Sequence, residues 1–512
     1  PSRGLGDVYK RQDYTYVEEN HVRRVEKRTT ALGEENVRLE VKESWLGTAP
    51  NVYARGRLKM KQGMDGIQTH YFYEETDRYG ALYKVTAETR IAGESVPGLS
   101  SRKVTYVSGQ GNNMRYEQYA RLADGAWSMT DASSYEYDVE NRWVKRTRAN
   151  GRVYERMMTC CGPLWERDEN GVTTSYSYNT ARQLVETIRS AVTDGETMIT
   201  PETITSYTRD ALGKITSLRR DAGPMTTVES REYDLLGRLI RETDILGRTT
   251  VRSYSGDGLV ETVTTPAGAT LITRKSPSGT VVRRYGTGQQ DILYTVEATA
   301  EGIRTTEAVP GGEGGEPRVV TGSSTVNGFG DLVRIAAANT LNGENVRTLA
   351  YDDKGRLIRE QLADMAPTLY AYDAFGNRTR AIVALEDEPT ILNSRITDYA
   401  YVAESREDGI YRLVSITSYT SSGTPVLQKQ AVLLSALSSV LAGKNVMTDP
   451  RGQDTVEWTE YGGGSVRLQK KTVPGVGSVA LTRVVDGFTT AVTGFDGATA
   501  RRQRTYTETG IT

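Results

Sequence analysis

A short turn motif that recurs along the chain constrains its fold more than any other feature. Residues 233–238 read Tyr-Asp-Leu-Leu-Gly-Arg, and residues 351–356 read Tyr-Asp-Asp-Lys-Gly-Arg. A further copy covers residues 372–376, and its tyrosine stands 21 positions after Tyr351. A fixed internal period is typical of repeat proteins, in which each unit packs on its neighbours instead of around one centre.

Weaker copies keep part of the pattern. Residues 244–248 repeat the Asp-x-x-Gly-Arg half of the motif ten positions after Asp234, and Arg209 takes the tyrosine position in the copy at residues 209–214. The predicted structural signature consists of Tyr137, Asp138, Tyr178, Asp210, Gly213, Tyr233, Asp234, Gly237, Arg238, Asp244, Gly247, Arg248, Tyr351, Asp352, Gly355, Arg356, Tyr372, Asp373 and Gly376.

The chemistry of one copy predicts a tight turn between two short strands. Aspartate caps its own backbone, and glycine accepts the positive φ that such a turn requires. Asn141 at the glycine position fits, because asparagine tolerates the left-handed region best after glycine. The segments between turns, such as residues 239–243 and 249–254, contain five to seven strand-forming residues. Turns every ten or eleven residues therefore predict a chain of β-hairpins.

Tyrosines two positions apart support the strand prediction. Examples are the pair Tyr176 and Tyr178 and the pair Tyr370 and Tyr372. Such pairs share one face of a strand, so stacked repeats would align them into ladders between neighbouring hairpins. Polar and apolar residues fall on both faces of residues 238–243, which predicts a sheet wetted on its outside and around a polar interior.

Composition agrees with a wet sheet. The 512 residues include 30 tyrosines and only 5 phenylalanines, which is unsuited to one large dry core. A net charge of −1 disfavours a nucleic-acid or membrane-surface partner. No run of about 18 apolar residues is present, so no membrane insertion is expected. Residues 428–441 are the one segment where the pattern is compatible with a helix.

Taken together, these copies resemble the YD repeat of the RHS family. The family pattern is Tyr-Asp, two variable residues, Gly-Arg and an apolar strand, and residues 233–258 and 351–378 resemble it most closely. The resemblance implies an all-β fold, in which an array of YD-repeat β-hairpins forms a curved, spiralling sheet as an open or partial hollow shell. In the family the shell typically encloses a C-terminal toxin or effector, and relatives serve as cell-surface or insecticidal-toxin components.

The resemblance also suggests how the chain is divided. Residues 1–12 are interpreted as a non-native scar, residues 13–130 as a β-rich repeat-like region and residues 131–290 as YD repeats. Residues 291–325 form a Gly-rich degenerate region, and residues 326–512 are again YD repeats. Residues 449–452, Asp-Pro-Arg-Gly, are only superficially similar to the family's self-cleavage segment. We therefore expect an internal fragment of the shell that lacks the family's core segment and its cargo.

The histidines and cysteines give little material for catalysis or metal binding. His21 and His70 are far apart in the sequence and are expected at the surface. Cys160 and Cys161 are adjacent, and a local packing role in one repeat is favoured over a vicinal disulfide or a reactive thiol.

Other candidate sites have simpler structural interpretations. Residues 168–171 resemble the start of a calcium loop, but Asn179 stands where the closing glutamate is needed, so a turn is expected. Residues 311–315 are Gly-rich without a Gly-Lys-Ser/Thr motif, which favours a surface loop over a phosphate loop. The turn aspartates need no acid–base role, and Arg238 and Arg356 are expected to pair with a nearby carboxylate.

The sequence therefore predicts a structural, non-enzymatic protein with no catalytic residue, metal site or cofactor. Its expected role is a repeat shell of an exported or cell-surface protein that encapsulates or presents a C-terminal toxin or effector. The expected partners are its own absent core or toxin domain, with cell-surface glycans or secretion-system components also considered. The alternative function is a carbohydrate-binding or adhesin-like surface module that uses the tyrosine ladders. Glycoside hydrolysis by a carboxylate pair is a minor alternative.

Overall fold

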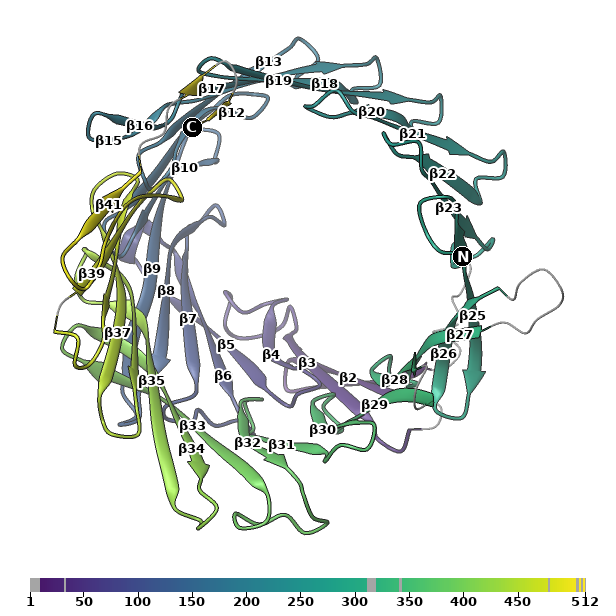
Figure 1. The fold of residues 1–512 in the computed structure, drawn as a ribbon. Coiled ribbons are helices and arrows are strands. Elements are labelled where there is room, and N and C mark those ends of the chain that lie inside the picture. Colours follow the sequence, from purple (N-terminus) through teal and green to yellow (C-terminus); the bar gives the residue numbers. More distant parts are fainter. Residues whose placement is uncertain are drawn as a thin grey trace.

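One continuous antiparallel sheet organises the whole chain. The computed structural model describes residues 10–31, 34–310, 319–339, 343–477, 479–502, 506–507 and 510–511. The sheet contains 39 strands, and along almost its entire length each strand pairs with the next strand of the sequence. Figure 1 shows these strands arranged around a ring that no strand crosses.

The first arc of the sheet covers residues 10–200. Its strands are β1 Lys10–Glu19, β2 Val22–Ala31, β3 Arg38–Trp45, β4 Leu58–Gln62, β5 Gln68–Glu75, β6 Tyr83–Arg90, β7 Ser101–Val107, β8 Asn113–Arg121, β9 Trp127–Tyr137, β10 Trp143–Arg148, β11 Val153–Met158, β12 Pro163–Arg167, β13 Thr173–Tyr178 and β14 Leu184–Arg189. A separate hairpin, β15 Val192–Asp194 and β16 Thr197–Thr200, projects from the end of this arc.

The middle arc continues from β14 directly into β17 and covers residues 203–309. Its strands are β17 Thr203–Arg209, β18 Ile215–Ala222, β19 Met225–Tyr233, β20 Leu239–Thr243, β21 Thr249–Tyr254, β22 Val260–Thr264, β23 Thr270–Lys275, β24 Val281–Tyr285, β25 Ile292–Thr299 and β26 Gly302–Val309.

The last arc covers residues 319–501. Its strands are β27 Val319–Val326, β28 Leu332–Asn339, β29 Gly343–Tyr351, β30 Leu357–Leu362, β31 Thr368–Tyr372, β32 Arg378–Val383, β33 Arg395–Arg406, β34 Gly409–Tyr419, β35 Pro425–Ala436, β36 Leu441–Thr448, β37 Asp454–Tyr461, β38 Val466–Thr472, β39 Val479–Val485, β40 Phe488–Thr493 and β41 Thr499–Arg501. A small hairpin follows, formed by β42 Tyr506–Thr507 and β43 Gly510–Ile511.

The sheet does not close but winds past its own beginning. In Figure 1 the last arc, in green and yellow, runs beside the first arc, in purple and blue. The backbone N–H of Ala123 donates to the carbonyl of Ala403 at 3.0 Å, and the N–H of Ala403 donates to Gly98 at 3.2 Å. Hydrogen bonds that side chains make between the two arcs join residues 286 to 312 positions apart in sequence. One winding of the sheet therefore takes about that length of chain.

Burial is distributed over small clusters. Five clusters of buried apolar residues are spread along the sheet, and the most deeply buried large side chain is Tyr411. In β19, half-buried and exposed residues alternate along the whole strand, as the two-residue period of a strand requires. Over the residues that the structure describes, apolar burial is divided among these clusters and is not gathered in one dry core, which agrees with the expectation from composition.

The helix considered for residues 428–441 is wrong. These residues belong to β35, to a turn and to the start of β36. β35 pairs with β34 from Pro425 to Ala436 and with β36 on its other side. Hydrogen bonding to two neighbouring strands outweighs the weak helix propensity of Gln, Lys, Leu and Ala.

Helical structure is otherwise limited to one short turn. Within the described ranges, the 3-10 turn at Arg78–Gly80 is the sole helical element. No helix found in those ranges is long and apolar enough to cross a membrane.

The sheet runs without a break in strand pairing past residues 130 and 290, so the division of the chain into repeat regions stays a prediction. Residues 1–9 and 311–318 lie outside the described residues, and most of the supposed scar and the Gly311–Gly315 loop fall there. Residues 10–12, which the sequence analysis set aside, belong to β1 and pair with residues 29–31.

Candidate functional site: the repeat turn and the seam between arcs

The motif at residues 233–238 folds into a turn in which each recurring position of the motif has a structural task. Oδ1 of Asp234 accepts the backbone N–H groups of Leu236 at 3.0 Å and Arg238 at 2.8 Å. Oδ2 of Asp234 accepts Nε of Arg238 at 2.7 Å. Gly237 has φ of 74°, a conformation that strains any residue with a Cβ atom. The aspartate therefore holds the backbone of the turn through its N–H groups, and the arginine stabilises the turn by its ion pair with the aspartate.

The other copies of the motif repeat this geometry. Arg238 and Arg356 each pair with a carboxylate, as the sequence predicts. In both turns the partner is the aspartate of the same motif. The corresponding contacts are Arg142 to Asp138 at 2.9 Å, Arg248 to Asp244 at 2.8 Å, Arg356 to Asp352 at 2.7 Å, and Asn377 Nδ2 to Asp373 at 2.9 Å. In the copy at Asp210, its carboxylate accepts the N–H groups of Leu212 and Lys214, and Gly213 has φ of 82°.

These contacts favour the charged form of the turn aspartates. Backbone N–H donation from Arg238, with its side-chain contact, lowers the pKa of Asp234 below its usual value. The guanidinium and backbone N–H of Arg248 lower the pKa of Asp244 in the same way. Both carboxylates are committed to the turn, which leaves them unsuited to acid–base chemistry.

The tyrosine of each repeat reaches back to the preceding strand. The hydroxyl of Tyr254 donates to the carbonyl of Leu239 at 3.1 Å, and that of Tyr372 donates to Leu357 at 2.7 Å. Both carbonyls belong to the residue that follows the motif arginine. The backbone pairing of β20 with β21 begins at Arg241, beyond Leu239. The hydroxyl therefore supplies a donor where the ladder between neighbouring hairpins is interrupted.

The motif arginine completes this contact between repeats. Arg238 lies over the ring of Tyr254, 4.4 Å from its centroid, and Arg356 lies over Tyr372 at 5.0 Å. Each arginine thus joins the aspartate of its own turn to the tyrosine of the next repeat. We call this unit, of aspartate, arginine, next-repeat tyrosine and capped carbonyl, the repeat clasp.

The clasp explains the departures from the motif. Tyr178 donates to Pro163, Tyr233 to Ile215 and Tyr351 to Leu332, while Tyr137 donates to Asn113. Arg209, in the tyrosine position, donates its Nε to the carbonyl of Leu184 at 3.2 Å. Sequence reasoning missed this carbonyl. In the two tandem copies, the signal that marks it is the shared 15-residue step from Leu239 to Tyr254 and from Leu357 to Tyr372.

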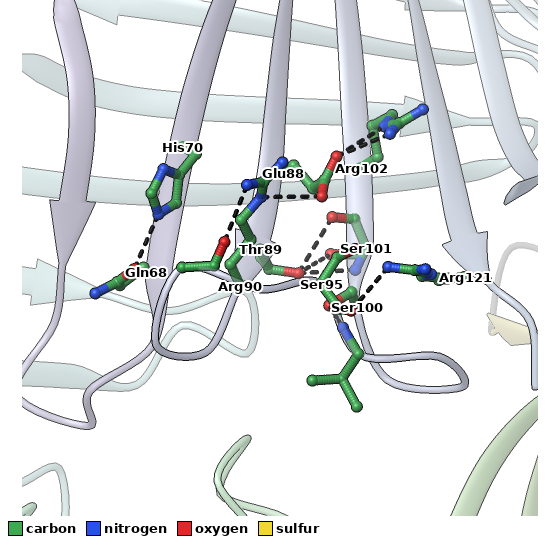
Figure 2. A network of polar contacts seen from close by, with 12 residues as sticks. Gln68, His70, Glu88, Thr89, Arg90, Ser95, Ser100, Ser101, Arg102 and Arg121 are labelled. Carbon is green, nitrogen blue, oxygen red and sulfur yellow. Dashed lines mark hydrogen bonds and ion pairs between the residues drawn. The ribbon is translucent and has the colours of Figure 1, made fainter. Parts of the chain in front are cut away.

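A polar network in the first arc shows how charge is buried in the wall. Figure 2 shows Glu88 held between Arg90 and Arg102. Glu88 is 2% exposed and accepts Nη2 of Arg102 at 2.8 Å and Nε of Arg90 at 3.1 Å. Burial alone would raise the pKa of Glu88, but the two guanidinium groups hold it below its usual value. Both oxygens of the Glu88 carboxylate are paired, so this side chain contributes to the packing of the wall.

His70 belongs to the same region. The sequence predicts this residue at the surface, but its side chain is only partly exposed. It is partly buried on β5 and hydrogen-bonds to Gln68 at 2.9 Å (Figure 2). Burial, with the nearby charge of Arg90, lowers the pKa of His70. The strand alternation of β5 places it opposite Glu88 of β6, a partner that the sequence spacing does not reveal. His21 is exposed, as expected.

Cys160 and Cys161 lie in one turn of the first arc as free thiols. Their sulfur atoms are 2.9 Å apart, and the side chain of Cys160 is exposed. The hydrogen bond from Cys160 raises the pKa of Cys161. The local packing role proposed for the pair stays a prediction.

Residues 168–171, which resembled the start of a calcium loop, and residues 449–452, which resembled a self-cleavage segment, form turns of the same kind as the repeat motif. Oδ1 of Asp168 accepts the backbone N–H groups of Asn170 at 2.8 Å and Val172 at 3.0 Å, and Asp449 does the same with Arg451 and Gln453. Among the residues that the structure places, no group of three or more His, Cys, Asp or Glu side chains is arranged to hold a metal.

The first and last arcs meet along a contact that we call the seam. Arg189 binds Asp486 at 2.7 Å, and Nε of Arg483 binds Asp194 at 2.8 Å. Other members are the ion pair of Arg38 with Asp331, the contact of Arg467 with Asn170, the stacking of Arg152 on Tyr461, and the buried cluster of Val172, Val192, Ile199 and Val485. The seam thus combines charged pairs with apolar packing, as protein–protein interfaces do.

The seam joins opposite edges of the sheet. Turns such as 234–237, 352–355 and 373–376 lie on one edge, which we call the Tyr-turn edge, and turns such as 244–247 lie on the opposite edge. Asp331 and Asp486 are at the Tyr-turn edge of the last arc, whereas Arg38 and Asp194 are at the opposite edge of the first arc. A hollow of about 1220 Å³ remains along the seam, between β5–β9 and residues 433–442.

Comparison with known proteins gives one sequence match and several structural ones. The family model of the RHS repeat matches residues 233–270. No curated protein sequence matches the chain. A crystal structure of TcdB2-TccC3 aligns at 11% identity over 98% of this chain and 37% of its own, with a TM-score of 0.34. The same protein without its hypervariable C-terminal region aligns at 12% identity over 95% and 35%, with a TM-score of 0.33.

A structure of the Photorhabdus luminescens Tc holotoxin pore aligns at 11% identity over 98% of this chain and 35% of its own, with a TM-score of 0.25. The chain thus spans about a third of the length of these structures. The repeat clasp formed by Arg238 and Tyr254 lies inside the segment that the family model matches. Residues 233–270 therefore match the RHS repeat, and they form part of one continuous antiparallel β-sheet.

Proposed function

We propose that this chain is the wall of an RHS-type shell that encloses or presents another polypeptide, a C-terminal toxin or effector, on an exported or cell-surface protein. The chain's own role in this proposal is structural and not enzymatic. The winding of the sheet past its own beginning carries the proposal, because a wall whose arcs join along a seam surrounds the space inside it. The RHS repeat at residues 233–270 supports the same role.

The polar character of the wall supports a polypeptide as its content. Both faces of the sheet carry charged side chains, most of them paired within the wall, as Glu88 is paired with Arg90 and Arg102. A surface that carries such paired charges stays hydrated.

The repeat tyrosines do not favour the carbohydrate-binding alternative. The hydroxyls of Tyr254 and Tyr372 cap backbone carbonyls, and their rings lie under Arg238 and Arg356. The hydroxyls and ring faces of these tyrosines are occupied by contacts between repeats, so little of either is left to contact a glycan.

A protease-protection experiment tests enclosure. An unfolded, protease-sensitive reporter of about 100 residues is fused after residue 512, and its cleavage rate is compared with that of the free reporter. We expect slower cleavage of the fused reporter. The matched control is the same fusion with Arg483→Ala and Arg189→Ala, which weakens the seam and should restore cleavage. Equal cleavage rates in the intact fusion and the free reporter would contradict enclosure.

A further inference from the structure

The turn between β11 and β12 carries two cysteines at its tip. Residues 158–162 read Met-Thr-Cys-Cys-Gly where the motif reads Tyr-Asp-x-x-Gly, so the cysteines stand at the two variable positions. Other copies hold Leu-Leu, Asp-Lys or Ala-Phe there, and Leu235 and Leu236 are 101% and 78% exposed. Because the motif accepts such different residues at these positions, the turn itself does not require cysteine.

The base of this turn is fixed by hydrogen bonds. The N–H of Thr159 donates to the carbonyl of Gly162 at 2.7 Å, and Nη1 of Arg142 donates to the carbonyl of Thr159 at 2.8 Å. The hydroxyl of Thr159 accepts the N–H of Cys161 at 3.2 Å, as the motif aspartate accepts the N–H two residues further on. The backbone on either side of the cysteines is therefore held in one arrangement.

This arrangement places the two thiols side by side at the surface. The Sγ atoms of Cys160 and Cys161 are 2.9 Å apart, and a disulfide bond is about 2.0 Å long, so a small approach would join them. The turn lies on the Tyr-turn edge, between the turns at residues 138–141 and 179–182, whereas the seam uses the opposite edge of the first arc. A small molecule can therefore reach the thiols from the rim of the shell.

The two thiols differ in access and in their surroundings. Cys160 is exposed, whereas Cys161 is partly buried, and the hydrogen bond from Cys160 raises the pKa of Cys161. Arg142 and Arg182, from the two flanking turns, interact electrostatically with Cys160 and Cys161 respectively. Positive charge beside an exposed thiol is the usual environment of a reactive cysteine. Cys160 is thus the thiol that an incoming reagent meets first.

We propose that Cys160 and Cys161 form a reversible vicinal disulfide by exchange with a low-molecular-weight disulfide such as oxidised glutathione. The thiolate of Cys160 attacks one sulfur of that disulfide, which releases a first thiolate and leaves a mixed disulfide on Cys160. The thiolate of Cys161 then attacks Sγ of Cys160, and the second thiolate leaves. Each leaving thiolate takes up one proton given up by the protein, so the protein loses two hydrogen atoms and one disulfide becomes two thiols.

The bond formed in this way is expected to be easily reduced. Adjacent Cα atoms are about 3.8 Å apart across a trans peptide, which is less than the roughly 4.4–6.8 Å that disulfides usually span. Disulfides under such strain belong to the labile class and not to the class that holds a fold together. The pair is therefore a redox site on the rim of the shell, and it is independent of the role of the wall as an enclosure.

Mass spectrometry of the full chain tests the proposal. The reduced protein is incubated in its folded state with oxidised glutathione, quenched with acid and digested. The peptide that contains Cys160 and Cys161 is expected to lose two hydrogen atoms and to carry no glutathione, and excess reduced glutathione should restore both thiols. The proposal is overturned if the folded chain stays reduced while the same chain in urea reacts, if a glutathione adduct persists, or if disulfide-linked dimers form instead.

The two single variants test the order of attack. Cys161→Ser lacks the thiol that resolves the mixed disulfide, so one glutathione should accumulate on Cys160. Cys160→Ser retains only the partly buried thiol and should gain its adduct several-fold more slowly. Equal rates of adduct formation in the two variants would contradict the assignment of Cys160 as the attacking thiol.

Discussion

Two turns on the same edge of the sheet show which contacts of this fold form within one turn and which require a segment distant in sequence. The turns at residues 234–237 and 327–330 share the side-chain cap of the first residue and the positive φ of the last. In the middle arc, Leu236 is 78% exposed. In the last arc, Phe329 holds the same turn position but is 7% exposed, and Arg38 of the first arc lies 4.1 Å from its ring centroid.

The comparison separates two sources of stability. The turn and the repeat clasp need only residues close in sequence, so they form equally in a single layer and at the seam. The seam needs a partner from the other arc, nearly 300 residues away. Repeat proteins owe their stability to contacts between neighbouring units. This shell adds a second set of contacts, between arcs.

The largest expected effect comes from placing a charge in the seam. Val485 is 0% exposed within the apolar cluster of the seam. Val485→Asp should cost more than about 3 kcal/mol, because an unpaired carboxylate would be buried. Thermal unfolding followed by circular dichroism measures the loss. The matched control Leu236→Asp should leave the melting temperature nearly unchanged, and equal losses in the two variants would remove the distinction between seam and single layer.

The next effect comes from the tyrosine hydroxyl of the repeat clasp. Tyr254→Phe in the middle arc and Tyr372→Phe in the last arc should each cost about 1–2 kcal/mol, since each leaves a backbone carbonyl without its donor. Hydrogen exchange of the flanking strands reports the local loss. Similar values at the two sites are expected if the clasp is local, and a clearly larger loss at Tyr372 would show that the seam contributes. Tyr14→Phe, at an exposed hydroxyl bonded to Gln12, is the control.

A smaller effect is expected from the turn glycine. Gly247 has φ of 75° and open space where a Cβ would lie, so Gly247→Ala introduces backbone strain without a clash. The expected cost is about 1 kcal/mol, read from chemical denaturation. Gly256→Ala, also in open space but without the positive φ, should cost less. No difference between the two variants would argue against the left-handed turn.

The smallest effect on the stability of each turn is expected from a change of pH. The pKa values of Asp234 and Asp244 are lower in the folded chain than the ordinary aspartate value. Their contribution to stability is therefore complete above about pH 4 and is lost as the pH falls through the folded pKa values. The melting temperature should stay level from pH 7 to pH 5 and decrease below about pH 4. The decrease should be smaller in Asp244→Asn, whose turn no longer titrates.

The local parts of this fold could be predicted from sequence, and the distant parts could not. Asp234, Gly237 and Arg238 act within a few residues of one another, so turn chemistry alone indicates their arrangement. The helix considered for residues 428–441 failed because strands on both sides decide the conformation of that segment. Local propensity carries no information about those neighbours.

The candidate site divides in the same way. The pairing of Arg356 with Asp352 could be predicted from their spacing, whereas the capped carbonyl of Leu357 required knowing where the strand ladder is interrupted. The seam pairs, such as Arg189 with Asp486, have no local signal, because the curvature of the 23 sheet strands between them, β17 to β39, sets which residues meet.

Disulfide trapping across the seam tests the central claim, one sheet that winds past its own start, most directly. Leu122 and Ala403 share a buried apolar cluster although they lie in different arcs. In a chain with Cys160→Ser and Cys161→Ser, cysteines introduced at these two positions should form an intramolecular disulfide under mild oxidation, identified by mass spectrometry of the linked peptides. A control pair at Leu122 and Leu236 should not link. Failure of the first pair to link, or equal linking of both pairs, would contradict the spiral.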